Sequence, residues 1–504
     1  MKNRKIWNIL SIIILVLQVA AEALTAAIIL RMNLLPGKYT LVLAIALVLF
    51  AAITAVLLFV RGKKPVSGVR RLIACILALL IVCGCALVSK LATDAYHTIE
   101  AVANAPQASV RNMYVLVPNE SSAQSLADTK GFTFGILTDY DIEHTQQAIS
   151  LIGDTIGTMP VIAQYETSAA LANALLGGQV DAAIMNGVSI VLLMEQEGYE
   201  EFTLQARILH AVPLADLEET APSTEGETIP PQQNITNTPF VMYVSGSDTR
   251  SDVLKISRSD VNILVVVNPI SKQILMINTP RDYYIPNPQG KGKLDKLTHC
   301  GLYGVDCSME ALGDLYELDV DYYAQINFTG FETLVDAVGG VDIYSEKAFK
   351  TAHKTTVQKG MNHLNGKEAL ALARERRAVK GGDNGRGKNQ MKIIKNLIEK
   401  LTDGPTLISG YSKILDSLKG MFKTDVSTAE ISAMVKMQLS DLATWNIQTY
   451  AVTGTGASKP SYSSPGHNAY VMIPNEKSIE HGANLVDRVL AGETLTEDDM
   501  KVPK

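Results

Sequence analysis

Two common catalytic signatures are absent from the 504 residues: there is no G-x-S-x-G nucleophile motif and no G-x-x-x-x-G-K-[ST] phosphate-binding loop. The sequence is therefore not that of a typical α/β-hydrolase or P-loop NTPase. The eight histidines show no metal-ligand spacing, and we expect His299 and His363, which lie in loop-like segments, to be structural. A formal net charge of -6 gives no reason to expect nucleic acid as a partner.

Cysteine is also scarce, with five residues in the chain. Cys75, Cys83 and Cys85 fall in an apolar run, where packing as small side chains is a more natural role than metal or lipid attachment. Cys300 and Cys307 enclose a short glycine-containing loop further along the chain. Two such cysteines can pair in an oxidising compartment, so a disulfide is favoured over free thiols.

Long apolar runs are concentrated before residue 92. Residues 6–30 contain one charge, Glu22, whereas residues 41–60 and 72–88 contain none. Each run is long enough, or nearly so, to cross a hydrocarbon core of roughly 30 Å as a helix. The pattern predicts a three-span membrane anchor over residues 1–92 rather than a cleaved signal peptide.

The basic residues around these runs predict the orientation. Lysines and arginines precede the first run and crowd the loop between the second and third, while the other short loop has few. The positive-inside rule then places the N-terminus in the cytoplasm of a multi-pass cell-membrane protein. Everything after residue 89 is expected to be extracytoplasmic.

Residues 111–212 alternate between strand-like and helix-like segments, which indicates an accessory α/β domain with a mainly parallel sheet. The pattern predicts helices over residues 142–156 and 188–196 and a strand over FTLQARIL. The segment YETSAALANALLGGQVDAAIMNG resembles one lobe of a periplasmic solute-binding protein. Small-ligand sensing and a spacer or docking role both remain open. Residues 213–239, rich in Pro, Thr, Glu and Gln, are expected to form a linker.

The C-terminal domain, residues 240–490, carries acidic residues and arginines at the ends of predicted strands. Three such pairs occur along the sequence: Asp248 with Arg250, Arg258 with Asp260, and Arg281 with Asp282. Arginine forks bind phosphate oxygens and aspartate oxygens bind Mg²⁺, so this combination suits a phosphorylated ligand with a divalent metal. For one pair a surface salt bridge is the simpler explanation. Three pairs at successive strand ends favour a site.

Further arginines lie in and after the segment NGKEALALARERR, where a helix is predicted to begin. Arg374 and Arg376 are two positions apart and would point to different sides of a continuous helix. Both could address one anion only if the helix ends near them, and the glycine pair at 381–382 makes such an ending plausible. Arg386 and Gln390 come next, before an amphipathic helix predicted over residues 391–401. The apolar helices here are expected to be core, and could also wall a slot for a polyprenyl chain.

A family resemblance lies in motifs that occur in this order: SGSD, SRSD, NTPRD, KLTH, NFTGFETLVDAVGGVDI, LNGKEALALARER and GDNGR. Together they resemble the LytR-CpsA-Psr (LCP) family of cell-wall glycopolymer ligases over about residues 240–401. The resemblance implies an α/β/α domain with a central mixed sheet. It also implies an enzyme that binds a polyprenyl-pyrophosphate-linked glycopolymer and passes the polymer, as a phosphodiester, to peptidoglycan.

The resemblance also suggests a role for each matching residue. It implies Mg²⁺ as the cofactor, associated with Asp248 and Asp260. It implies four catalytic arginines that address the pyrophosphate, and these are Arg258, Arg281, Arg374 and Arg376. Arg386 and Gln390 match substrate-binding positions of a G-R-x-x-R-Q motif. Asn389 replaces the second arginine of that motif, so one phosphate contact is missing or is supplied elsewhere, for instance by Lys388.

The sequence as a whole predicts an α/β protein with three transmembrane helices, an accessory lobe and an LCP-type domain. The expected activity is a Mg²⁺-dependent phosphotransferase that attaches a polyprenyl-pyrophosphate-linked anionic glycopolymer, of teichoic acid or capsule type, to peptidoglycan. Its expected partners are that lipid-linked polymer, peptidoglycan and membrane lipid. Two alternatives remain: a polyprenyl-pyrophosphate hydrolase, and a cell-envelope sensor or regulator without catalysis.

Overall fold

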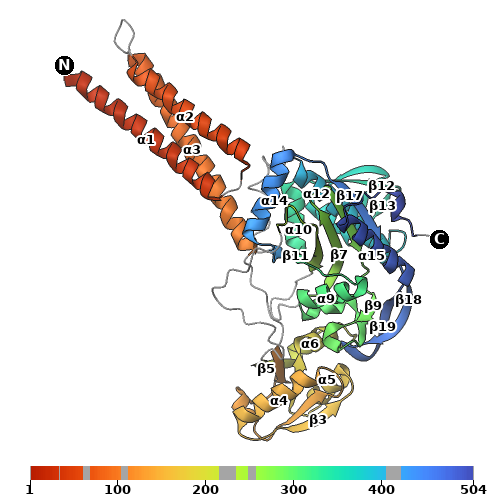
Figure 1. Ribbon diagram of the computed structural model, residues 1–504. Helices are drawn as coiled ribbons and strands as arrows, with labels where there is room; N and C mark the ends of the chain where they lie inside the picture. Colours follow the sequence, from red (N-terminus) through yellow and green to blue (C-terminus); the bar gives the residue numbers. More distant parts are fainter. Residues whose placement is uncertain are drawn as a thin grey trace.

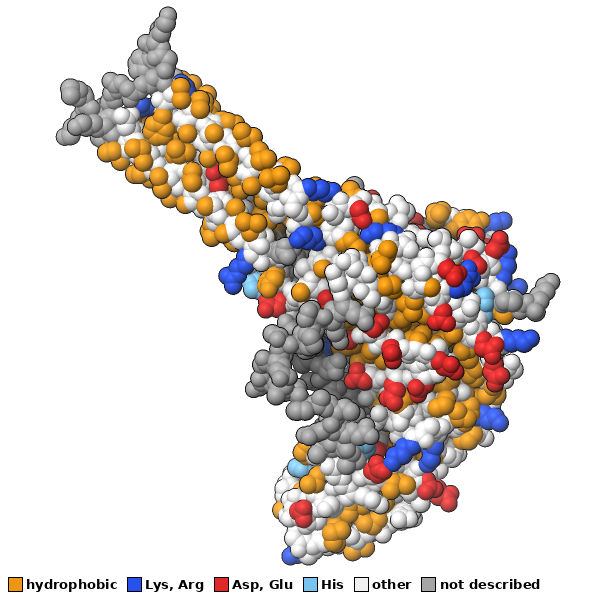
Figure 2. Space-filling view, in the orientation of Figure 1, with side chains coloured by type: hydrophobic (Ala, Val, Ile, Leu, Met, Phe, Trp, Pro, Cys, Tyr) orange, Lys and Arg blue, Asp and Glu red, His pale blue; other side chains and the backbone are white. Residues whose placement is uncertain are grey.

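Three long helices lead into two α/β domains in the computed structural model (Figure 1). The structure describes residues 2–32, 35–60, 68–103, 112–214, 234–247, 257–403 and 422–502. Helices α1 (Lys2–Met32), α2 (Gly37–Phe59) and α3 (Gly68–Ala103) pack side by side, and each contains an apolar stretch long enough to cross a membrane. Hydrophobic side chains cover the surface of this bundle in Figure 2. The expected three long apolar helices are confirmed.

Polar side chains inside the bundle face one another. Gln18 donates to the carboxylate of the buried Glu22 at 2.8 Å, and the hydroxyls of Thr25 and Ser89 lie 2.9 Å apart. Polar groups at membrane depth are costly unless another part of the protein satisfies them. Glu22, the one acid of the first apolar run, is therefore buried inside the helix bundle with a hydrogen-bond donor on its carboxylate.

The C-terminal domain lies at the end of the bundle where α1 and α3 terminate, opposite the N-terminus (Figure 1). Helix α3 contacts both α14 (Thr428–Asp441) and β16 (Phe422–Thr424) of that domain, and Lys38 Nζ donates to the carbonyl oxygen of Ser440 at 2.5 Å. The N-terminus and the C-terminal domain are thus at opposite ends of the apolar helices.

The accessory domain is a five-stranded sheet with helices on both faces, and it lies on the side of the C-terminal domain away from the bundle (Figure 1). In chain order its elements are β1 (Asn112–Pro118), η1 (Leu126–Thr129), β2 (Thr133–Leu137), α4 (Ile142–Ile156), β3 (Val161–Tyr165), α5 (Ser168–Leu176), β4 (Ala182–Asn186), α6 (Gly187–Leu193), α7 (Phe202–Gln205) and β5 (Ala206–Pro213). The strand order is β3-β2-β4-β1-β5. Helix α4 covers one face, and α5 and α6 cover the other.

Two details of this domain differ from the sequence-based expectation. The sheet is mixed rather than mainly parallel, because β1 runs antiparallel to both β4 and β5. The predicted strand FTLQARIL begins with the helical turn α7, so that β5 starts only at Ala206. Phe202 is buried at the start of this turn, and its packing outweighs the strand propensity of an isolated aromatic residue.

The C-terminal domain is built on a six-stranded mixed sheet of order β16-β11-β6-β7-β8-β17. The first part of the domain contains β6 (Phe240–Ser247), β7 (Ser259–Asn268), β8 (Gln273–Asn278), β9 (Tyr284–Pro286), η2 (Pro288–Gly290), β10 (Leu294–Lys296), α8 (Leu297–Cys300), η3 (Gly301–Tyr303), α9 (Val305–Tyr316), β11 (Tyr322–Asn327) and α10 (Phe328–Ala337). The remainder contains β12 (Val341–Ser345), β13 (Phe349–Lys350), β14 (Thr356–Val357), β15 (Gly360–Leu364), α11 (Gly366–Ala373), α12 (Asp383–Thr402), β16, α14, β17 (Asn446–Ala451), β18 (Gly454–Ser461), β19 (Ser464–Pro474), α15 (Glu476–Leu490) and η4 (Asp498–Met500).

Alternation along the central strands explains the three layers. Tyr243, Leu264 and Leu275 face a core shared with α9 and α15, while Ile263 and Met276 face a core shared with α12 and α14. Successive side chains of a strand point to opposite faces, so helices cover both sides of the sheet. The predicted α/β/α architecture with a central mixed sheet is confirmed.

The expected disulfide is wrong in this structure, where Cys300 and Cys307 are free thiols. Cys300 ends α8 and Cys307 lies in α9, and both are buried in the core beneath the sheet. The two thiols interact, which together with burial raises the pKa of Cys300 well above its usual value. Helical packing brings the two cysteines together without a covalent bond.

The polar end of the sequence, LTEDDMKVPK, favours a frayed tail, and this expectation is wrong for residues 495–502, which the structure describes. Leu495 is 1% exposed, and its amide donates to Gln273 Oε1 at 2.7 Å. A single apolar side chain therefore fixes the polar tail against the edge of the sheet.

Candidate functional site

Arg281 and Asp282 follow β8 directly, at one end of the central sheet. Strands β7 and β8 form an antiparallel pair, and a turn at Pro280 then carries the chain away from the sheet. The backbone after this turn is held in place, because the carbonyl of Arg281 accepts from Thr298 N at 2.8 Å and that of Asp282 accepts from Met472 N at 2.7 Å. The sheet end thus presents both side chains on a fixed backbone.

Ion pairs connect this turn to its surroundings. Arg281 Nη1 lies 2.6 Å from Asp260 Oδ1, near the start of β7, and Arg281 Nε lies 3.8 Å from Asp282 Oδ1. Lys296 Nζ lies 3.6 Å from the same Asp282 oxygen. Arg281 Nε is buried without a hydrogen-bond partner among the described residues, so the guanidinium retains donor capacity for a ligand.

Helix α12 brings a second set of charges to the same place. Arg386 Nη2 lies 2.5 Å from Asp383 Oδ1 in the first turn of the helix. The pKa of Asp383 is raised by burial, and the charges that act on it include Arg386, Asp282, Arg281 and Arg376. The helix was expected to begin at residue 391, so the sequence placed these residues in a preceding loop. Their position in the first turns gives them a rigid backbone.

Gln390 was predicted to bind substrate. In the structure its side-chain amide makes a hydrogen bond within the protein. Its Nε2 donates to the carbonyl of Ala373 at 3.0 Å, which ties α12 to the last residue of α11. Asn389, at the position where the family motif has arginine, has a buried amide nitrogen without a hydrogen-bond partner among the described residues. A polar donor at that position is therefore left for a ligand or water.

Helix α11 ends at Ala373, as the pair Arg374 and Arg376 requires if both are to serve one site. Arg374 stacks over the ring of Phe328 at 4.7 Å from its centroid, and Arg376 is exposed and acts electrostatically on Asp383. Glu375, between them, points inward and accepts hydrogen bonds from the backbone amides of residues 352, 377 and 378.

Of the two predicted metal ligands, one can be placed. Asp260 lies in the site with Arg281 on its Oδ1 oxygen, whereas Asp248 lies outside the described residues. Within the part of the chain that the structure describes, no group of three His, Cys, Asp or Glu side chains is arranged to hold a metal ion. Mg²⁺ commonly uses only one or two carboxylates and takes its remaining ligands from water and phosphate, so Asp260 with Asp248 would be a sufficient protein donor set.

Arg258 completes the cluster on the side nearest the accessory domain. Its guanidinium pairs with Glu195 of that domain, and its Nε is buried without a hydrogen-bond partner in the described residues. Burial lowers the pKa of Arg258; Glu195 opposes that shift, and Arg281 adds to it. Every predicted catalytic arginine therefore borders the same end of the sheet.

Two charged residues of this cluster, Lys296 and Asp383, were not assigned a role from the sequence, and Asp282 was singled out only as the partner of Arg281. Burial lowers the pKa of Lys296, Asp282 opposes the shift, and Arg258 and Arg281 add to it. Sequence signals existed for all three, since Asp282 stands in NTPRD, Lys296 in KLTH and Asp383 in GDNGR. Among the described residues the cluster holds six cations against four carboxylates, and these are Arg258, Arg281, Lys296, Arg374, Arg376 and Arg386 with Asp260, Asp282, Asp383 and the accessory domain's Glu195.

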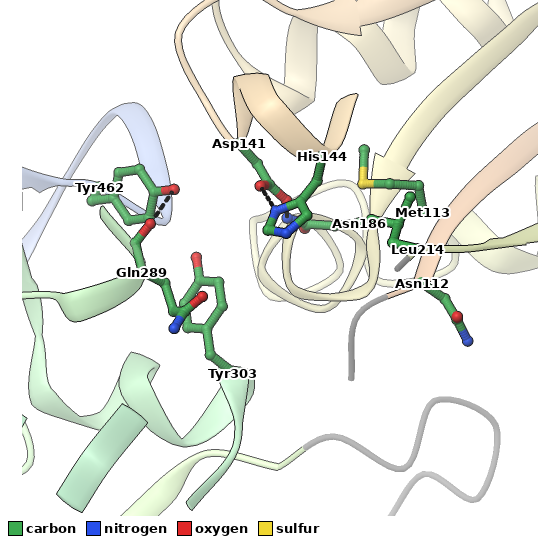
Figure 3. A pocket seen from close by; sticks show the side chains of 9 residues that line it. All are labelled: Asn112, Met113, Asp141, His144, Asn186, Leu214, Gln289, Tyr303 and Tyr462. Carbon is green, nitrogen blue, oxygen red and sulfur yellow. Dashed lines mark hydrogen bonds and ion pairs between the residues drawn. The ribbon is translucent and has the colours of Figure 1, made fainter. Parts of the chain in front are cut away.

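Apart from the charged cluster, a small hollow lies between the accessory and C-terminal domains (Figure 3). Its volume is about 30 Å³, enough for one or two water molecules. Asp141 spans its accessory side, with one oxygen 2.5 Å from His144 Nδ1 and the other 2.6 Å from Asn186 Nδ2. On the opposite wall Tyr462 donates to the backbone oxygen of Gln289 at 3.2 Å. This hollow is a small polar gap in the interface, and the charged cluster is the candidate active site.

A model of the LytR_cpsA_psr family matches residues 214–484 of the chain. This range contains every residue of the charged cluster except Glu195, its partner from the accessory domain.

Relatives with known names are similar over the same domain. A polyisoprenyl-teichoic acid–peptidoglycan teichoic acid transferase TagU from Enterococcus faecalis is 33% identical over 200 residues, which cover 39% of this chain and 65% of the relative. A TagU from Bacillus cereus AH820 is 33% identical over 199 residues, 39% of this chain and 64% of the relative. The chain thus spans slightly less than two thirds of these relatives. Among solved structures, TagV of B. subtilis matches with 25% identity and a TM-score of 0.43, over 51% of this chain and 99% of that one.

Proposed function

The chain belongs to the LytR-CpsA-Psr family, and from that membership we propose that it is a Mg²⁺-dependent phosphotransferase of the cell envelope. Its donor would be a polyprenyl-pyrophosphate-linked anionic glycopolymer of teichoic acid or capsule type, and its acceptor peptidoglycan. The TagU relatives, whose name describes a transfer of teichoic acid to peptidoglycan, support this substrate class. The three apolar helices would hold the enzyme in the membrane, with the N-terminus in the cytoplasm and the C-terminal domain outside.

The observation that carries the proposal is the excess of fixed cations at one end of the sheet. Arg281 and Arg386 are each paired with an aspartate, and those aspartates hold the guanidinium groups in place while the site remains cationic overall. A pyrophosphate carries the complementary charge and accepts bidentate hydrogen bonds from guanidinium groups. Preorganised cations of this kind stabilise the charge that develops on phosphoryl oxygens during transfer.

The transfer itself would be a displacement at phosphorus. A hydroxyl oxygen of the acceptor forms a bond to the phosphorus that carries the glycan, and the bond from that phosphorus to the bridging oxygen breaks. The polyprenyl phosphate leaves with the bridging oxygen, and the hydroxyl proton passes to water or a site carboxylate. Arg258, Arg281 and Arg386 would bind the phosphate oxygens throughout. Mg²⁺, held by Asp260 and Asp248, would neutralise further negative charge on the pyrophosphate.

Transfer of a polyprenyl-pyrophosphate-linked glycan to peptidoglycan fragments, measured with the full-length protein in detergent, tests this function. Hydrogen bonds to charged groups contribute about 1.5–3 kcal/mol each, so Arg281→Ala should slow transfer about 10- to 100-fold. Asp260→Asn should reproduce the effect of a chelator, and added Mg²⁺ should restore the wild-type protein alone.

Lys350→Ala, which removes an exposed charge of β13, is the matched control and should transfer at the wild-type rate. If folded Arg281→Ala and Asp260→Asn proteins also transfer at the wild-type rate, the charged cluster is not the active site. Release of free glycan phosphate without a peptidoglycan product would instead identify a hydrolase, because water rather than a sugar hydroxyl would then be the acceptor.

A further inference from the structure

The accessory domain reaches the charged cluster through one side chain, Glu195. This residue follows α6 closely, and its carboxylate pairs with the Arg258 guanidinium. The Arg258 side chain is 22% exposed and that of Glu195 is 44% exposed, so the pair lies at the rim where the cluster opens to solvent. An acid from a separate domain therefore neutralises one of the arginines predicted to bind pyrophosphate.

Packing on both sides of this pair holds it in place. Val188 and Leu192 of α6 form a small apolar cluster with Leu302, which is fully buried in η3. Gly301, the neighbour of Leu302, lies so close to the SRSD segment that an added Cβ would stand 2.5 Å from Ser259 N. Helix α6, which precedes Glu195, and the segment that carries Arg258 thus pack against the same short turn.

Polar contacts fix the accessory domain from a second direction. The hydroxyl of Tyr140 lies 2.5 Å from that of Tyr303, which in turn lies 2.9 Å from Ser463 Oγ. Lys293 Nζ donates to the backbone oxygen of Asp139 at 3.3 Å. Because several contacts hold the two domains together, Glu195 is presented to Arg258 by a docked domain and not by a free surface loop.

The position of Arg258 within the cluster indicates what the pair does. The charges that act on Arg258 are Glu195, Arg281, Asp260 and Asp282, whereas those that act on Arg386 are Asp383, Asp260, Arg281 and Arg376. Arg258 is therefore at the edge of the cluster next to the accessory domain. A carboxylate and a phosphate oxygen compete for the same guanidinium hydrogens.

We propose that Glu195 competes with the donor's pyrophosphate for Arg258, so that the accessory domain sets the affinity of the active site for its donor. The inference rests on the proposed function, since it takes Arg258 to be a pyrophosphate ligand. In the donor-free enzyme Glu195 holds the guanidinium in position. When donor binds, a phosphate oxygen replaces the carboxylate, which is exposed enough to turn into solvent.

Binding of farnesyl pyrophosphate, a short polyprenyl pyrophosphate, to the full-length protein in detergent tests the competition. Exposed ion pairs contribute about 0.2–1 kcal/mol, so Glu195→Gln should lower the Kd for the probe about 1.4- to 5-fold at low ionic strength. High salt should reduce this difference, because it screens exposed charges. Glu197→Gln, which removes an equal charge from an exposed side chain two residues away, should bind the probe as the wild type does.

The possible outcomes distinguish the competition by Glu195 from the proposed phosphotransferase function. If Arg258→Ala and Arg281→Ala weaken probe binding while Glu195→Gln binds no tighter than the wild type, the competition is overturned and the proposed site stands. Weaker binding by Glu195→Gln would likewise overturn it and make Glu195 a residue that positions Arg258. Equal binding by the wild type, Arg258→Ala and Arg281→Ala would overturn the proposed function and the competition together.

Discussion

Glu375 shows how a single residue between two functional ones can determine their geometry. It is 1% exposed, although it lies in the segment between Arg374 and Arg376. Burial alone would raise its pKa, but the backbone amides of residues 378, 352, 377 and 376 donate to the carboxylate and lower it overall. The sequence predicted the two arginines through their motif, whereas the inward direction of Glu375 depends on amides that only the folded loop brings together.

Replacement of Glu375 should therefore impair activity through the arginines. In Glu375→Gln the carboxylate that accepts these amides is lost, and since hydrogen bonds to charged groups contribute about 1.5–3 kcal/mol, we expect transfer to fall about tenfold or more and the protein to unfold more easily. Transfer kinetics and thermal unfolding of the full-length protein measure the two effects. Glu346→Gln, which changes an exposed glutamate, should alter neither.

The pH dependence of this effect has a definite sign. Because the folded-state pKa of Glu375 is lowered from its value of 4.5, its contribution to stability is complete above about pH 4.5 and is lost as the pH falls through the lower folded-state value. The difference in Tm between the wild type and Glu375→Gln should accordingly narrow below pH 4.5. A difference that stays constant down to pH 3 would contradict the assignment.

At the scale of elements, the bounds of a helix were predicted best where a residue that favours a helix end stands at the end of the packed helix. Helix α4 has the predicted bounds, and Gly157 in the left-handed conformation ends it. Helix α12 was predicted to start too late, because the glycines at 385 and 387 lower the helix propensity of its first turns. Tertiary contact explains the glycine at 387: an added Cβ would lie 2.2 Å from the side chain of Asn278, at the end of β8.

This close approach makes Gly387 a test of how α12 is placed. Gly387→Ala must displace the Asn278 side chain or push the first turns of α12 away from the sheet, and with them Asp383 and Arg386. Overpacking costs typically about 1–3 kcal/mol, and a displacement of about 1 Å in a site can slow a reaction about 100-fold. We expect transfer to fall at least about tenfold while the protein remains folded. Gly84→Ala, in open space on α3, should have no effect on transfer.

At the scale of the whole molecule, composition was enough to predict three apolar helices and two α/β domains, but not how the domains meet. Their interface joins residues far apart in the chain, such as Tyr140 with Tyr303 and Glu195 with Arg258. Tyr140, Tyr303 and Glu195 are unremarkable in their own segments, so no local pattern identifies them. A contact between domains is specified by the complementary shape of two folded surfaces, and this is why Glu195 was not recognised as a neighbour of the site.

The proposed orientation of the whole molecule in the membrane can be tested at its two ends. The N-terminus and the C-terminal domain lie at opposite ends of the apolar helices, and α2 ends and α3 begins on the side of the N-terminus (Figure 1). Basic residues in the sequence between α2 and α3 and at the N-terminus favour the cytoplasm. In a background without native cysteines, Ser67→Cys should therefore be protected from a membrane-impermeant thiol reagent in whole cells, and Ser223→Cys should react. Permeabilised cells should label both. Labelling of Ser67→Cys in intact cells would invert the proposed topology and place the charged cluster on the side where peptidoglycan is absent.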